Sequence, residues 1–300
     1  MGGTGFIGRF LVKYLLNDGH EVFAASNGKT KVSFAGEAKY LHFDRFNPLS
    51  VKESIGNLDH FDAVYDQLAF RIKDVKELTD IMAGKTDSYI FTSSAAVYSD
   101  KSGLLSEDQF DPFSYEFDDK ESEKSYSDGK RNVEAYVYQN ADFAVSSARF
   151  PSILGNCDST LRFQDHLRRI EQGRPFWAPE KAGRRNFTWV DDAGRFLAWL
   201  GTHDKKGPYN GASAECFDVR TFLNLIGKVM GKTVSFQSQS EQDKSRYYKD
   251  VDFILSTKKA NHEGFKFTST EEWLSKEVAN YRIQPDIECS SQEYADSLFP

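Results

Sequence analysis

Residues 1–10 of the chain read MGGTGFIGRF and contain Gly2, Gly5 and Gly8. In a loop of this spacing one glycine permits a tight turn, one lets the backbone approach a phosphate, and one lets the next helix pack closely. Apolar residues then recur at helical spacing until a stop at Asn17-Asp18-Gly19, and a strand-like stretch follows at 20–26. The stretch therefore predicts a loop that binds the phosphates of a dinucleotide.

Strand-like and helix-like stretches alternate through the first half of the chain. We expect strands at 20–26, 38–43, 62–68 and 88–94, and helices at 49–56, 71–84 and about 125–139. This alternation predicts an α/β fold, a Rossmann-type doubly wound parallel sheet with helices on both faces. We assign 1–150 and 186–204 to this domain, 151–185 and 205–283 to a smaller C-terminal α/β substrate-binding domain, and 284–300 to a polar tail.

The strand that normally precedes such a glycine loop is not present in the sequence. In this fold that strand lies in the middle of the sheet. Without it, two neighbouring strands would keep open edges and apolar surface would be exposed. We therefore expect a handful of apolar residues upstream of Met1 in the native protein. A complete central strand built from residues 1–300 would contradict this expectation.

The composition excludes several classes of protein. The 38 Lys and Arg against 45 Asp and Glu give a net charge of −7, which argues against a general nucleic-acid binder or a ligand of anionic membranes. We find no secretory signal and no apolar run of about 18 residues, and the three cysteines are scattered, so we expect a reduced, cytoplasmic protein. The six histidines lack metal-ligand spacing, and we expect no metal site.

Several stretches, in their order along the chain, resemble the extended short-chain dehydrogenases/reductases. They are GGTGFIG (2–8), IFTSSAAVY (90–98), YSDGK (126–130), RRNFTWVDD (184–192) and YNGAS (209–213). Within that superfamily, residues 1–283 are similar to the NAD-dependent epimerase/dehydratase family, of which UDP-glucose 4-epimerase is the best-known member. The resemblance implies NAD or NADP as cofactor and a nucleotide sugar, or a related hydroxyl or carbonyl compound, as substrate. Homodimers are common in that family.

The resemblance implies Ser94, Tyr126 and Lys130 as catalytic residues. Tyr126 and Lys130 are four residues apart and share one face of a helix, and an ammonium beside the phenol would lower its pKa. Tyr126 would then take a proton from a substrate hydroxyl as hydride leaves for the nicotinamide, with Ser94 bonding the same oxygen. The non-functional alternatives are that the spacing of Tyr126 and Lys130 arises by chance and that Ser94 is an ordinary serine at a strand end. Thr92 or Ser93 would be the next candidates for the role of Ser94.

The resemblance also implies a set of cofactor-binding residues at the glycine loop and at strand ends: Gly2, Gly5, Phe6, Ile7, Gly8, Ser26, Asn27, Asp44, Leu68, Lys130 and Pro151. Many NAD binders carry an acid after the second strand, but here that place holds Ser26 and Asn27. Lys29 and Lys31 would meet the 2′-phosphate of NADP, or they form a solvated basic turn. Asp44 fits the acid that contacts adenine in the family, or it caps a turn.

Three residues are implied as substrate-binding: Ser93, Ser152 and Arg185. Arg185 matches an arginine that holds the diphosphate of a nucleotide sugar, a task that suits its planar fork. Arg184 either shares this role or forms a surface pair with Arg185. The adjacent Asp191-Asp192 pair more simply caps a helix.

The sequence also bears on the reaction. Sugar 4,6-dehydratases of the family carry an acid after the catalytic Ser or Thr, whereas Ser94 is followed by Ala95 and Ala96, so we favour epimerisation or carbonyl reduction. Asp66 and Gln67 depart from the family's pattern where the cofactor passes.

Two alternatives to an enzyme stay open. The segment DFILSTKKANHEGFKF (252–267) also resembles chloroplast stem-loop-binding proteins, which act on RNA. A regulator that binds NAD(P) without turnover is the third interpretation. The negative net charge and the complete set of Ser94, Tyr126 and Lys130 favour the enzyme.

Overall fold

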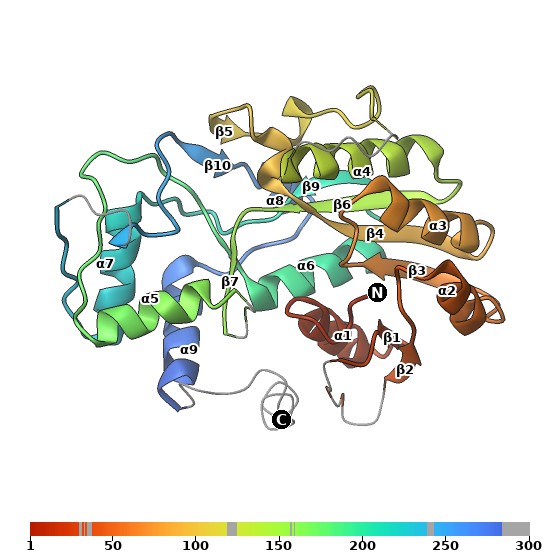
Figure 1. The fold of residues 1–300 in the computed structure, drawn as a ribbon, viewed down its shortest axis with the longest axis horizontal. Helices are drawn as coiled ribbons and strands as arrows, with labels where there is room; N and C mark the ends of the chain where they lie inside the picture. The colour runs from red at the N-terminus through yellow and green to blue at the C-terminus, as the bar shows by residue number, and fades with distance from the viewer. Residues whose placement is uncertain are drawn as a thin grey trace.

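The computed structural model describes residues 1–29, 32, 34, 38–118, 125–156, 158, 160–238 and 243–283. Its largest sheet has four parallel strands in the order β3 (Phe61–Asp66), β4 (Thr86–Ser94), β6 (Ala144–Phe150) and β9 (Gly207–Asn210). Helices α3 (Ile72–Met82) and α4 (Tyr126–Asn140) lie on one face, and α1 (Gly8–Asn17) and α6 (Val190–Thr202) lie on the other (Figure 1). This arrangement confirms the predicted α/β fold with a doubly wound parallel sheet.

A second, two-stranded parallel sheet continues the first one beyond a gap. It consists of β1 (Phe23–Ser26) and β2 (Lys39–His42), followed by α2 (Pro48–Ile55). Within the described segments, backbone hydrogen bonds from the first residues of the chain connect to both strands: the Met1 amine donates to the Tyr65 carbonyl at 2.6 Å, and the Gly2 N–H donates to the Ala25 carbonyl at 2.9 Å. The Phe23 and Phe61 rings also meet edge to face, with centroids 5.7 Å apart. Among the described residues no strand lies between β1 and β3, so the predicted upstream strand stays a prediction.

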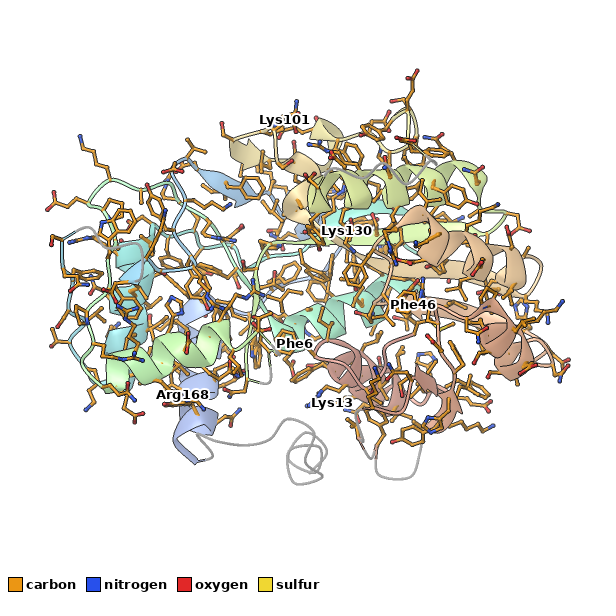
Figure 2. The ribbon with its side chains drawn as sticks, viewed as in Figure 1. Phe6, Lys13, Phe46, Lys101, Lys130 and Arg168 are labelled. Atoms are coloured by element: carbon orange, nitrogen blue, oxygen red, sulfur yellow. The ribbon has the colours of Figure 1, made fainter. Side chains whose placement is uncertain are left out.

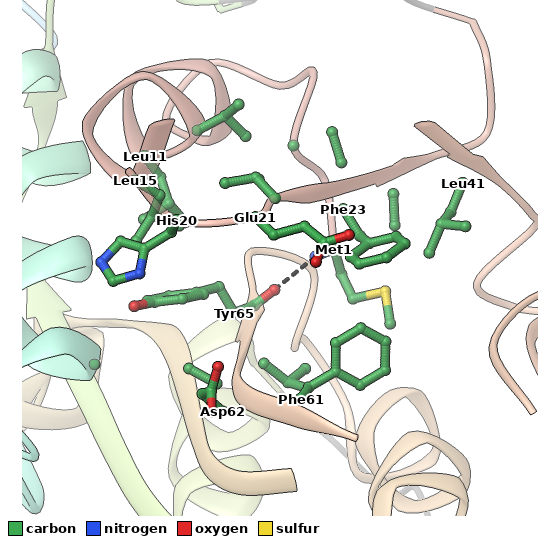
Figure 3. Close-up of a pocket in the computed structure, with 18 of the residues that line it drawn as sticks. Met1, Leu11, Leu15, His20, Glu21, Phe23, Leu41, Phe61, Asp62 and Tyr65 are labelled. Carbon is green, nitrogen blue, oxygen red and sulfur yellow. Dashed lines mark hydrogen bonds between the residues drawn. The ribbon is translucent and has the colours of Figure 1, made fainter. Parts of the chain in front are cut away.

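The gap between the two sheets forms a mostly apolar slot, a cavity of about 500 Å³. Figure 3 shows Leu11, Leu15, Phe23, Leu41 and Phe61 around it, with the dashed line from Met1 to Tyr65 between them. His20 and Asp62 lie toward its polar rim. The slot is not part of the candidate active site, because neither Ser94 nor Tyr126 nor Lys130 lines it.

The predicted helices and strands of the first half occur within about three residues of the expected bounds. Local chemistry explains the ends of α4, for example, because the Ser125 side chain accepts the N–H of Asp128 at 3.2 Å and caps the first turn. One boundary needs correction. Residues 207–210 form β9, which pairs with β6, so they belong to the large sheet rather than to the substrate-binding domain.

The C-terminal part contains α7 (Val219–Met230), where the apolar spacing of residues 217–232 predicts a helix, and several elements that were not predicted from the sequence. The unexpected helices are α5 (Arg162–Glu171), α8 (Lys258–His262) and α9 (Thr270–Ile283). Two short parallel pairs join them, β7 (Ile153–Leu154) with β8 (Thr188–Trp189) and β5 (Gly103–Leu105) with β10 (Phe253–Leu255). A core that includes Phe163, Phe187, Phe222 and Trp273 holds this part together.

Two other features considered in the sequence are the C-terminal tail and membrane-spanning helices. The predicted tail at 284–300 lies outside the described residues. Within the described part of the chain, no helix combines the length and the apolar character needed to cross a lipid bilayer.

Candidate active site

The glycine loop lies beside the carboxyl ends of β1 and β3. A Cβ atom at Gly8 would stand 2.1 Å from the Gly2 carbonyl oxygen, so only glycine fits at that position, and Gly2 itself has a φ of +73°. The N–H of Gly5 donates back to Gly2 at 3.0 Å and closes the turn. The N–H groups of Phe6 and Ile7 have no protein acceptor within the described segments. Free N–H groups at the start of a helix attract anions, so the loop fits a dinucleotide diphosphate.

Arg9, which was not predicted from the sequence as a site residue, supports this loop. Its side chain is only 3% exposed; Nε donates to the Gly5 carbonyl at 3.2 Å and Nη2 to the Thr4 carbonyl at 3.3 Å. The signal was a charged residue on the buried apolar face of α1. A buried charge needs polar partners, and the carbonyls of Gly5 and Thr4 are two of them.

The turns after β1 and β2 hold the predicted adenosine contacts. The side chains of Ser26, Asn27 and Asp44 each accept a hydrogen bond from the backbone N–H two residues later, at 3.0 to 3.3 Å. Asp44 thus caps a turn, and its contact with adenine stays a prediction. Lys29 is described and Lys31 lies outside the described residues, so the choice between NAD and NADP stays open. At the end of β3, Leu68 lies against Gly2 in the glycine loop.

Ser94 ends β4 and Tyr126 begins α4, and the structure brings their side chains together. The Ser94 oxygen accepts the N–H of Ala96 at 3.1 Å, which leaves its proton for another acceptor. Desolvation raises the pKa of Tyr126, whereas the Ser94 hydroxyl and then the charge of Arg162 lower it. Tyr126 is 58% exposed, so the desolvation is partial and a substrate can reach the phenol.

Lys130 lies one helical turn beyond Tyr126 but does not contact the phenol oxygen. Its ammonium donates to the Ala69 carbonyl at 2.6 Å and the Thr92 carbonyl at 3.0 Å, and it lies 5.9 Å from the centroid of the Tyr126 ring. Figure 2 shows Lys130 in the middle of the molecule, in contrast to Lys101 and Arg168 at its periphery. Burial lowers the pKa of Lys130 to about 8.

One expectation about these two residues is corrected. The sequence predicted that Lys130 lowers the pKa of Tyr126, but in the structure burial raises this pKa, and the lowering influences come from Ser94 and Arg162. The reason is that two backbone carbonyls hold the Lys130 ammonium away from the phenol oxygen. The sequence analysis did not single out Arg162, at the start of α5, since that helix was not expected.

The predicted substrate residues fall into two places. Ser93 is 3% exposed and donates its hydroxyl to Glu134, so it faces the interior. Pro151 and Ser152 directly follow β6, and Arg185 Nη2 donates to the Ser152 hydroxyl at 2.8 Å. Arg185 is the better candidate for an anionic ligand than Arg184, which is exposed and paired elsewhere in the second domain.

Arg185 carries a buried charge that no carboxylate neutralises among the described residues. It is 7% exposed, burial lowers its pKa to about 10, and its Nε has no hydrogen-bond partner within the described segments. The hydroxyl of Tyr247 nearby is also buried without a partner in that part of the chain. Arg184 by contrast pairs with Asp252 at 2.6 Å. An unpaired buried guanidinium fits a phosphate-bearing ligand.

No metal site was expected from the sequence, but among the described residues one group of side chains has the ligand types and spacing for a metal ion. The exposed His60, Asp62 and Asp87 have ligand atoms within 4.8 Å of one another. They lie at the amino ends of β3 and β4, the edge of the sheet opposite to Ser94. They are therefore not part of the candidate active site.

Comparison with known proteins places these observations in a family context. The profile of the NAD dependent epimerase/dehydratase family matches residues 1–83. A relative from Arabidopsis thaliana, the chloroplast stem-loop binding protein of 41 kDa b, is 30% identical over 299 residues, covering 94% of this chain and 72% of that protein.

Solved structures with this fold include two sugar-nucleotide epimerases. UDP-glucose 4-epimerase from Thermus thermophilus, in complex with NAD, is 19% identical with a TM-score of 0.71, and the match covers 94% of this chain and 97% of that one. UDP-glucuronic acid 4-epimerase from Bacillus cereus, also in complex with NAD, is 18% identical with a TM-score of 0.72 and the same coverage. At these identities the similarity shows the fold.

Proposed function

Because the chain belongs to the NAD-dependent epimerase/dehydratase family, we propose that it is an NAD(P)-dependent epimerase or reductase. Its substrate would be a nucleotide sugar or a related hydroxyl or carbonyl compound. The observation that carries the proposal is the interaction of Ser94, at the end of β4, with Tyr126, with Lys130 one turn away. The neighbouring strand β3 is followed by Leu68, which lies against the glycine loop. Dehydration is disfavoured, since Ala95 and Ala96 supply no acid.

The residues of the chain fit a dinucleotide at one end of the site. The glycine loop and the free N–H groups of Phe6 and Ile7 would hold its diphosphate, and Ser26 and Asn27 lie where its ribose would be. The bound nicotinamide would supply the hydride acceptor. The solved relatives in complex with NAD support this cofactor type for the fold.

The chemistry assigned to the chain's own residues is proton transfer and anion binding. Tyr126 in its deprotonated, phenolate form would take the proton of a substrate hydroxyl, and the resulting neutral phenol would return the proton in the reverse step. Ser94, whose oxygen is already engaged by Ala96, would donate its proton to the same substrate oxygen or to the phenolate. Arg185 would hold a phosphate of the substrate, because its buried charge has no carboxylate partner in the described chain.

The first experiment is a fluorescence titration of the purified chain with NADH and NADPH, followed by turnover assays with a panel of UDP-sugars. We expect Tyr126→Phe to keep the cofactor affinity and to lose turnover by about 10²–10⁴-fold, because only the proton transfer is removed. Tyr136→Phe is the matched control, since Tyr136 lies on the same helix and its hydroxyl interacts with Lys76 instead. Equal turnover in Tyr126→Phe and wild type would refute the assigned mechanism.

A second candidate function is supported by the Arabidopsis relative, whose name describes binding to stem-loops. If this chain shares that activity, fluorescence anisotropy with a stem-loop RNA should show binding that weakens steeply with salt. Binding that Tyr126→Phe leaves unchanged, together with no affinity for NADH or NADPH, would favour the RNA binder. The formal charge of −7 is the observation against it.

A further inference from the structure

Helix α4 carries a third polar residue in line with Tyr126 and Lys130. Glu134 follows at the same four-residue spacing, so the three side chains lie along one face of the helix. Each of them meets a different one of the last three residues of β4, which are Thr92, Ser93 and Ser94. The contacts of this one face therefore fix where the helix lies along the strand.

Glu134 is the most deeply buried of the three. Its side chain and that of Arg149 are both fully buried, and they pair through two nitrogens of the guanidinium at 2.6 to 3.1 Å. Arg149 lies on β6 directly opposite Ser93 in the parallel register. The hydroxyl of Ser93 donates to the same carboxylate. The carboxylate thus joins the helix, β4 and β6 at one point.

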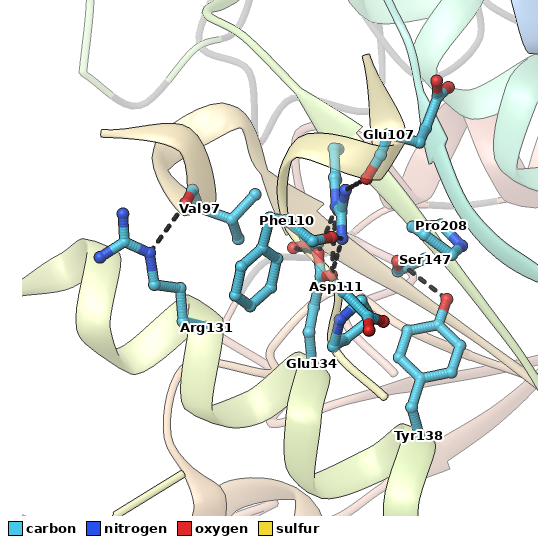
Figure 4. Close-up of polar contacts among 12 residues, drawn as sticks. Val97, Glu107, Phe110, Asp111, Arg131, Glu134, Tyr138, Ser147 and Pro208 are labelled. Atoms are coloured by element: carbon cyan, nitrogen blue, oxygen red, sulfur yellow. Dashed lines mark hydrogen bonds and ion pairs between the residues drawn. The ribbon is translucent and has the colours of Figure 1, made fainter. Parts of the chain in front are cut away.

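The rest of the Arg149 guanidinium holds the segment that follows Ser94. Nη1 donates to the Tyr98 hydroxyl at 2.7 Å and to the Glu107 carbonyl at 2.9 Å, and Nη2 donates to the Phe110 carbonyl at 3.0 Å. Figure 4 shows these dashed lines converging between Glu134, Glu107 and Phe110. All five N–H groups of the guanidinium are used, which makes the cluster a rigid joint.

We propose that Ser93, acting through Glu134 and Arg149, is a positioning residue that sets the contact between Ser94 and the Tyr126 phenol. Its hydroxyl ties the residue next to Ser94 to the same helix that carries Tyr126. This assignment replaces the predicted substrate contact of Ser93, because the side chain faces the interior and its proton is engaged. The inference rests on the proposed function, which gives the Ser94–Tyr126 contact its use.

The test compares Ser93→Ala with Ser147→Ala in the full chain. Ser147 is also buried on the sheet, at 0% exposure, and its hydroxyl pairs with Tyr138 of α4 at 3.0 Å, one turn beyond Glu134. The two variants lose the same atom and one helix–sheet hydrogen bond each. Only Ser93→Ala loosens the strand end that carries Ser94, so the pair separates positioning from general packing.

The readout is the pKa of the Tyr126 phenol, followed by NMR of tyrosine labelled at Cζ and assigned through Tyr126→Phe. We expect Ser93→Ala to raise this pKa by about 0.5 unit or more, because the Ser94 hydroxyl lowers it in the native chain. Ser147→Ala should leave it unchanged. Ser93→Cys, with a similar volume and a weaker donor, carries the same expectation if the alanine variant does not fold.

Either of two results would overturn the proposal: an unchanged Tyr126 pKa in a folded Ser93 variant, or an equal shift in the Ser147 variant. Neither depends on a substrate or a cofactor. Failure of the proposed function would appear separately, as no binding of NADH or NADPH and no turnover. Once a substrate is known, Ser93→Ala should lower kcat by about tenfold, which corresponds to an increase of about 1.4 kcal/mol in the activation free energy, with KM unchanged.

Discussion

Two buried arginine–carboxylate pairs lie at the carboxyl ends of the strands, and they differ in how completely their hydrogen bonds are made. Arg149 uses all five of its N–H groups, two of them on the Glu134 carboxylate. Arg45 binds Asp66 at 2.6 Å through Nη2, but its Nε and Nη1 have no hydrogen-bond partner within the described segments. Both arginines are less than a tenth exposed.

The difference between the two pairs follows whether the neighbouring strands are hydrogen-bonded to each other or separated by the gap between the two sheets. Arg149 lies on β6, every residue of which pairs with β4, whereas Asp66 ends β3, the strand that borders the slot, although neither Asp66 nor Arg45 lines the slot itself. Burial alone would raise the pKa of Asp66, but Arg45 and the Met1 amine lower it. Where the sheet is continuous, the polar groups at its edge are satisfied and hold the candidate catalytic residues. Near the open part of the sheet, by contrast, two nitrogens of Arg45 have no hydrogen-bond partner within the described segments.

The comparison predicts unequal losses when each arginine is replaced by methionine. Arg149→Met should lower the free energy of unfolding by about 3–5 kcal/mol, since it leaves the Glu134 carboxylate buried without its partner. Arg45→Met should cost less, about 1–3 kcal/mol, because unpaired N–H groups of Arg45 are removed together with the ion pair. Urea unfolding monitored by circular dichroism measures both. An Arg45 variant as unstable as the Arg149 variant would contradict the comparison.

The slot itself predicts that a strand added before Met1 would be stabilising. Three buried apolar side chains contribute about 1.5–3 kcal/mol each, and five ordered residues cost about 1–2 kcal/mol each, with new ladder hydrogen bonds of about 1 kcal/mol offsetting part of that cost. We expect a five-residue extension of alternating Val and Ile to raise the unfolding free energy by about 2–3 kcal/mol. The measurement is again urea unfolding.

The control for that prediction is an extension of five serines, which removes the charged amine from the slot but supplies no apolar side chains. Only the apolar extension should also protect the amides of β1 and β3 from hydrogen exchange, because it would give both strand edges a partner. If the serine extension stabilises the chain equally, the effect comes from moving the amine and the slot does not accept a strand.

The sequence predicted the fold well where periodicity and composition agree. The strands and helices from α1 to α4 were predicted from local patterns, namely apolar spacing and the glycines, whereas Ser94 and Tyr126 were implied as partners by the family resemblance. Helix α5 was not predicted from the sequence, because charged residues make up most of its exposed face. A stretch of this composition resembles an exposed loop as much as a helix.

Contacts between distant segments could not be predicted in the same way. Arg149 and Glu134 are 15 residues apart, and Arg149 and Glu107 are 42 apart, so no local pattern joins them. The direction of the Lys130 ammonium likewise depends on the carbonyls of Ala69 and Thr92, which come from other elements. Charged residues inside apolar stretches, such as Arg9 and Arg149, were the signals that sequence reasoning could have used.

The smallest expected effect concerns the Met1 amine at the edge of the slot. Burial lowers its pKa to about 6 from 8.0, so between pH 6 and 8 the unfolded chain binds more protons than the folded one. This group therefore makes the folded state more stable as the pH rises from 6 to 8, by about 2 kcal/mol. Chemical Nα-acetylation should abolish that part of the rise.

Comparing free and acetylated chains isolates the amine from other groups that titrate nearby. Burial raises the pKa of Glu277 to about 7 from 4.5, so Glu277 makes the folded state less stable as the pH rises from about 4.5 to about 7, and it does so in both chains. The difference in unfolding free energy between the two chains should thus be largest near pH 6 and smallest above pH 8. A difference independent of pH would mean that the amine is solvated, and that the end of the slot beside Met1 is open to water.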